Sequence, residues 1–134
     1  MNLENMRKLR TRMRSRKNPV KFDMDKWFTH NEMGLLPPEE LLEVVEDHPC
    51  GTVACLSGQV AIMSLQEGNK IEDPHGNWLF REAKRYLGLT EHEADSLFYG
   101  HWWKHYYRKS LSLISKAEAI RELTRLIEKE EASQ

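Results

Sequence analysis

Residues 50–58 read Cys-Gly-Thr-Val-Ala-Cys-Leu-Ser-Gly and open the stretch that decides the fold, which runs on to about Leu65. Large apolar side chains repeat at helical spacing along it, and small side chains repeat on a second face. The large set is Val53, Leu56, Val60 and Met63, and the small set is Ala54, Ser57, Gly58 and Ala61. A helix with two packing faces is buried, so the sequence predicts a central core helix over about residues 52–65, with Thr52 as its N-cap.

Start and stop signals place further helices on both sides of this segment. Helices are predicted over residues 2–17, from Pro38 to about Asp47, and over residues 78–87, where Gly88 ends the helix. The next helix is predicted to begin after Thr90 and to run to about Phe98. The pairs Thr90/Glu93 and Ser115/Glu118 are capping boxes that open the last two helices. No strand pattern of useful length is present, so we expect an all-α fold: one compact domain of about five to six helices. Its expected parts are a basic amphipathic helix (1–18), a helical core domain (19–127) and a frayed C-terminus (128–134).

The composition is that of a soluble globular protein, with 134 residues of which 40% are hydrophobic and 31% are charged. No apolar run approaches the roughly 18 residues that a membrane helix needs, and no secretory signal is apparent. Two cysteines are too few for a disulfide framework. We therefore expect a reduced protein of the cytoplasm, without a cofactor and without a membrane partner.

The net charge of −1 hides a strong asymmetry along the chain. Residues 1–30 carry nine Lys and Arg against three Asp and Glu, whereas residues 32–48 carry six acidic side chains and no Lys or Arg. Such a split indicates either an anionic partner or an internal pairing. In the second case the basic first helix would lie on the acidic segment of its own chain.

Several short motifs occur together in a fixed order. They are Phe22-Asp23-Met24-x-x-Trp27, Cys50-Gly51-Thr52-Val53-Ala54-Cys55, Leu87-Gly88-Leu89, Leu97-Phe98 and Trp102. This framework, which covers about residues 20–103, resembles a group of small uncharacterised proteins of bacteriophages and bacterial genomes. The resemblance implies a phage or prophage origin and an intracellular helical fold, but it supplies no activity and no catalytic residues.

The two cysteines suggest two kinds of chemistry. Cys50 is placed just before the predicted central helix, whose N-terminus would lower the pKa of a thiol and favour a nucleophile. Alternatively, Cys50 and Cys55 with His101 and His105 supply the two thiolates and two imidazoles of a structural zinc site. Because free cysteine is among the most buried residues, simple packing is the expected role of both thiols.

Nucleic-acid binding is the first of two binding hypotheses. The predicted helix pair over residues 83–97 has the packing skeleton of a helix-turn-helix, but its second helix would present three carboxylates to the DNA, so we interpret it as a structural corner. The arginine-rich first helix is the better candidate for phosphate contact. Its candidate residues are Arg10, Arg12, Arg14, Arg16 and Lys17.

Protein binding is the second hypothesis and the preferred one. Residues 99–108 are dense in aromatic and basic side chains, which dominate binding hot spots. The candidates are Trp102, Trp103, Tyr106, Tyr107 and Arg108. On this hypothesis the chain is a non-enzymatic module that captures a host protein, for example as an inhibitor of a host defence protein.

Overall fold

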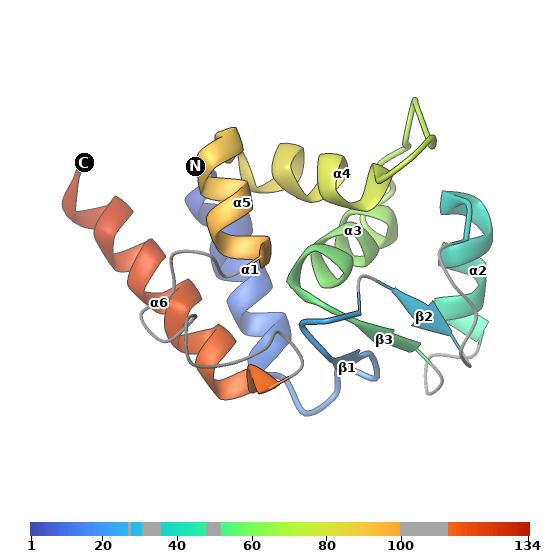
Figure 1. The fold of residues 1–134 in the computed structure, drawn as a ribbon, viewed down its shortest axis with the longest axis horizontal. Coiled ribbons are helices and arrows are strands. Elements are labelled where there is room, and N and C mark those ends of the chain that lie inside the picture. The colour runs from blue at the N-terminus through green and yellow to red at the C-terminus, as the bar shows by residue number, and fades with distance from the viewer. Residues whose placement is uncertain (27, 31–35, 48–51, 100–112) are drawn as a thin grey trace.

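The computed structural model describes residues 1–26, 28–30, 36–47, 52–99 and 113–134 (Figure 1). Six helices and three short strands lie within these ranges. The helices are α1 (Leu3–Arg14), α2 (Pro38–Asp47), α3 (Leu56–Gln66), α4 (Trp78–Leu87), α5 (Glu91–Tyr99) and α6 (Lys116–Ala132). The strands are β1 (Lys21–Phe22), β2 (Thr29–His30) and β3 (Thr52–Ala54). The fold is mostly helical, which confirms the predicted all-α class. No helix in the described ranges is both long and apolar enough to cross a membrane.

Helix α3 lies at the centre of the molecule, and every side chain from Leu56 to Leu65 is buried. It belongs to two hydrophobic clusters at once. Val60 and Met63 pack with α1, α4, α5 and α6, whereas Ile62 packs with α2 and the strands. Figure 1 shows this division, with α1 and α6 on one side of α3 and α2 on the other. The prediction of a buried central helix is therefore confirmed.

The predicted start of that helix is wrong by four residues. Thr52–Ala54 forms β3, the middle strand of a small sheet of order β1-β3-β2, and α3 begins only at Leu56 with Cys55 as its N-cap. The strand pairs in parallel with β1 (Lys21 opposite Val53) and antiparallel with β2 (Thr29 opposite Val53). Thr52 and Val53 are β-branched, which suits a strand flanked on both edges. Partners distant in the sequence thus determine the conformation here.

The other helix signals place their elements well. Helix α2 spans Pro38–Asp47 as predicted, and α4 ends at Gly88, which adopts the left-handed conformation at φ 64°. Both capping boxes form: Thr90 and Glu93 exchange hydrogen bonds at 2.9 and 3.1 Å, and Ser115 does so with Glu118. These boxes need only local partners, which explains why the sequence reveals them.

Helix α1 is part of the core rather than a separate arm. Met6, Leu9 and Met13 are fully buried in the cluster shared with α3 to α6. Its main partner is α6, which runs antiparallel to it, and α2 lies beyond α3 (Figure 1). Of the two alternatives for the charge asymmetry, internal pairing of the basic helix with the acidic segment 32–48 is therefore wrong for α2, the described helix of that segment. Helix α6 continues to Ala132, through most of the segment that was expected to fray, and Glu131 pairs there with Arg7 at 3.2 Å.

The junction between α4 and α1 yields a test of the packing. The backbone N–H of Asn2 donates to the carbonyl of Leu87 at 2.8 Å, and a Cβ added at Gly88 would lie 3.0 Å from that nitrogen. We expect Gly88→Ala to lower the free energy of unfolding by about 2 kcal/mol, because it combines backbone strain with this contact. Gly68→Ala should lower the free energy of unfolding by about 1 kcal/mol. Gly68 also has a positive φ, but a Cβ added there would meet no described atom within 4 Å. Urea denaturation measures both, and equal losses would show that the Asn2 contact is irrelevant.

Candidate functional site

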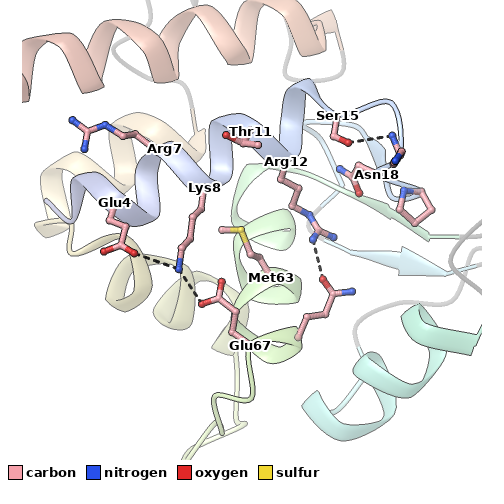
Figure 2. Close-up of a pocket in the computed structure, with 12 residues that line it drawn as sticks. Glu4, Arg7, Lys8, Thr11, Arg12, Ser15, Asn18, Met63 and Glu67 are labelled. Atoms are coloured by element: carbon pink, nitrogen blue, oxygen red, sulfur yellow. Dashed lines mark hydrogen bonds and ion pairs between the residues drawn. The ribbon is translucent and has the colours of Figure 1, made fainter.

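An open groove of about 690 Å³ lies between the solvent-facing side of α1, the turn that follows it and the end of α3 (Figure 2). Its charged lining comprises four cations and two carboxylates. These are Arg7, Lys8, Arg12 and Lys17, with Glu4 and Glu67. The remaining surface includes the amide of Asn18, the hydroxyl of Ser15 and the apolar Met63 and Pro19. The groove is therefore basic overall, with both polar and apolar walls.

The carboxylates of the groove are already engaged at the end near the start of α1. Lys8 Nζ lies 3.8 Å from Glu4 and 3.7 Å from Glu67, as the dashed lines of Figure 2 show. Glu67 also accepts a hydrogen bond of 2.5 Å from the hydroxyl of Tyr86. Arg7 pairs with Glu131 of α6. This half of α1 is thus neutralised by the chain itself.

Arg12 is held differently, by two neutral amides. Its Nε donates to Gln59 Oε1 at 3.3 Å, and its Nη1 donates to Gln66 Oε1 at 2.9 Å. It forms no ion pair with a described residue, and burial lowers the pKa of its guanidinium. Gln59 and Gln66 are the site residues that the sequence did not reveal, because glutamines distant from Arg12 in the chain carry no recognisable motif.

Five basic side chains at the C-terminal end of α1 and in the next turn form no ion pair with any described residue. They are Arg10, Arg12, Arg14, Arg16 and Lys17, the set that the sequence proposes for phosphate contact. Arg14, Arg16 and Lys17 are exposed, and Arg10 and Arg12 are half-buried. At about 100° per residue, Arg10 and Arg14 lie on the side of α1 opposite Arg12. The structure therefore places only Arg12 and Lys17 of the five in the groove.

Of the thiol and metal candidates, Cys55 is described, while Cys50, His101 and His105 lie outside the described residues. Cys55 is buried, and its Sγ lies 3.1 Å from the hydroxyl of Ser57. Burial raises the pKa of this thiol, although hydrogen bonds from Ser57 and from backbone amides act against it. Within the described ranges, no three His, Cys, Asp or Glu side chains gather in an arrangement that holds a metal ion.

The candidates for protein binding also lie outside the described residues; they are Trp102, Trp103, Tyr106, Tyr107 and Arg108. The described chain just before them is itself aromatic: the ring of Phe80 meets Phe98 edge-on at 5.5 Å and stacks on Tyr99 at 5.7 Å. Phe98 is buried and Tyr99 half-buried. Phe98 and Tyr99, the last two residues of α5, thus form an aromatic cluster with Phe80 of α4.

No protein-family model, no curated protein and no solved structure matches this chain.

The buried thiol of Cys55 leads to a pH-dependent prediction. A raised pKa in the folded state means that the thiol's contribution to stability is complete below the ordinary thiol pKa of about 8.5 and declines as pH rises above it. Cys55→Ala should lower the free energy of unfolding by about 1–2 kcal/mol at pH 7, because it truncates a small core side chain. Above a pH of about 8.5, the difference in free energy of unfolding between the wild type and Cys55→Ala should become smaller. Urea denaturation from pH 6 to 10 measures it, and parallel stability curves would contradict the assignment.

Proposed function

We propose that this protein binds nucleic acid through the basic end of α1, and that it acts by binding rather than by catalysis. The observation that carries the proposal is the set of five cations without a carboxylate partner among the described residues. Arg7 and Lys8 show that the chain pairs other cations of the same helix internally. Unpaired cations attract phosphates, because binding releases the counterions condensed on the nucleic acid.

The distribution of the five cations favours an extended strand over a small anion. Arg12 and Lys17 line the groove, whereas Arg10 and Arg14 lie on the other side of α1. A strand that crosses the C-terminal end of the helix would bring successive phosphates to both sides, while a single small anion reaches one. The predicted aromatic run over residues 102–107 would add base stacking, which favours a single-stranded ligand.

The salt dependence of binding tests this function. We expect Arg14→Gln and Arg16→Gln each to weaken binding of a 20-nucleotide single-stranded DNA and to reduce the slope of log affinity against log salt by about 0.7, the value for one lost contact. Fluorescence anisotropy titrations at about 50 to 200 mM salt measure the affinity and its slope. Lys70→Gln is the matched control, because Lys70 is exposed and does not line the groove.

Substitutions serve better here than deletion of residues 1–18, because the deletion would remove Met6, Leu9 and Met13 from the core. An affinity that does not change with salt would overturn the proposed function. So would a double Arg14→Gln, Arg16→Gln variant with the affinity of the Lys70→Gln control.

A protein partner is the second candidate function, and the aromatic content of residues 99–108 favours it. Here the chain would capture a host protein through Trp102, Trp103, Tyr106, Tyr107 and Arg108.

A pull-down from host lysate separates this candidate from the first. Trp103→Ala and Tyr107→Ala should each lose the captured protein, since truncation of a hot-spot aromatic costs 2 kcal/mol or more, on the order of a thirtyfold loss of affinity. Nuclease treatment of the lysate should leave the captured protein in place. Equal recovery of the same protein by wild type and both variants, measured by mass spectrometry, would rule this surface out.

A further inference from the structure

Arg12 carries a charge that the described part of the chain holds in place without neutralising it. Its two hydrogen-bond partners, Gln59 and Gln66, are uncharged. A guanidinium has five N–H donors, and Nη2 forms no hydrogen bond with a described residue. Figure 2 shows the side chain extending from α1 over the groove. The unused donors are therefore available to a ligand in the groove.

The orientation of the Gln59 amide is fixed by the core. Its side chain is fully buried, and Nε2 lies 3.4 to 3.5 Å from the carbonyl oxygens of Val20, Lys21 and Ala54. These carbonyls accept and cannot donate, so the amide nitrogen faces them and Oε1 faces Arg12. Oε1 also accepts from Asn18 at 3.2 Å. A rotation of this amide would place its NH₂ group, which cannot accept a hydrogen bond, against the guanidinium. The amide therefore keeps Oε1 toward Arg12, and the conformation of the Arg12 side chain is preorganised.

Other arginines of the chain show what a purely structural pairing looks like. Arg85 and Arg125 each donate to a glutamate three residues earlier, Glu82 and Glu122, at 2.5 Å. These bonds raise the pKa of both arginines, whereas burial lowers the pKa of Arg12. Carboxylates thus neutralise these two arginines, whereas Arg81, which is exposed, donates to the backbone carbonyls of Asp73 and His75. Arg12 is partly desolvated and held by amides, and it has no counter-ion among the described residues.

We propose that the groove beside Arg12 binds one phosphoryl group, and that this contact fixes where a nucleic-acid strand crosses α1. Arg12 supplies the planar pair of donors that matches two phosphate oxygens. Lys17 and Ser15 also line the groove and contribute polar groups to it. The second half of this proposal rests on the proposed function, whereas the phosphoryl site itself stands on the geometry of Arg12.

This site differs in kind from the exposed cations. Arg14 and Arg16 act as point charges, so a lysine replaces either of them with little loss. Arg12 acts through the shape of its guanidinium, and a lysine cannot reproduce its bonds to Gln59, Gln66 and a phosphate together. The charge-conserving exchange of arginine for lysine therefore separates positioning from simple attraction.

The test compares two pairs of variants for binding of a 20-nucleotide single-stranded DNA at one fixed salt concentration. We expect Arg12→Lys to weaken binding about tenfold. Its control, Arg85→Lys, should weaken binding less than about twofold, because Arg85 is exposed, pairs with Glu82 and does not line the groove. Gln66→Glu places a carboxylate beside Arg12 and should also weaken binding about tenfold. Gln66 is exposed, so this variant retains the core. Gln134→Glu adds the same charge at the exposed C-terminal residue and is its control.

A second arm uses inorganic phosphate as the probe. At constant ionic strength, phosphate should shift the ¹⁵N–¹H signal of Arg12 Nε in the wild type and should shift it far less in Gln66→Glu. If the DNA binds but both pairs of variants behave alike and phosphate shifts nothing, the phosphoryl site is wrong and the proposed function survives. If phosphate shifts Arg12 while no DNA binds, the site holds a free phosphate or phosphomonoester, and the proposed function is overturned.

Discussion

The structure depends on one constraint, the need to cover α3 on all sides. A helix whose side chains are buried from Leu56 to Leu65 cannot exist next to water, so α1, α2, α4 and the strands all pack around it. Three of its buried residues are polar, namely Ser57, Gln59 and Ser64, and Gln59 has the largest polar group. Gln59 must find partners for its amide, and it finds them in the carbonyls of residues 20, 21 and 54 and in the side chains of Arg12 and Asn18. The same constraint that closes the core therefore also holds the arginine of the candidate site.

Local signals in the sequence predict most of the helices, and long-range pairing accounts for what they miss. Capping residues such as Thr90 and Ser115 act within three or four positions, and the left-handed Gly88 ends α4 through bonds to its own last turn. Strand β3 offers no such signal, because three residues are too few to show an alternation. Its neighbours come from residues 21–22 and 29–30, and only the folded chain brings them together.

The sequence likewise predicts one part of the candidate site, its basic residues, and misses the other part, the contacts that hold or neutralise them. Charge counting finds Arg10, Arg14 and Arg16 as a basic group, since their number alone is unusual. It cannot show that Arg7 and Lys8 are neutralised by Glu131, Glu4 and Glu67, nor that two glutamines hold Arg12. A neutral amide beside a cation is visible only in space. The alternative in which α1 lies on the acidic segment 32–48 is wrong for α2, the described helix of that segment, for a related reason. Net charge indicates attraction, but apolar packing of Met6, Leu9 and Met13 determines which helix lies against α1.

The antiparallel contact between α1 and α6 joins the two most distant helices of the chain. During synthesis from the N-terminus, α1 leaves the ribosome long before Lys116, the first residue of α6, has been made. Until then the apolar side of α1 lacks Leu123 and Ile127, and its methionines have only part of their final cover. Contacts of such high sequence separation form slowly and expose apolar surface in the meantime. The order of synthesis therefore completes this domain only when α6 docks, and until then the nascent chain exposes part of the apolar side of its basic amphipathic helix.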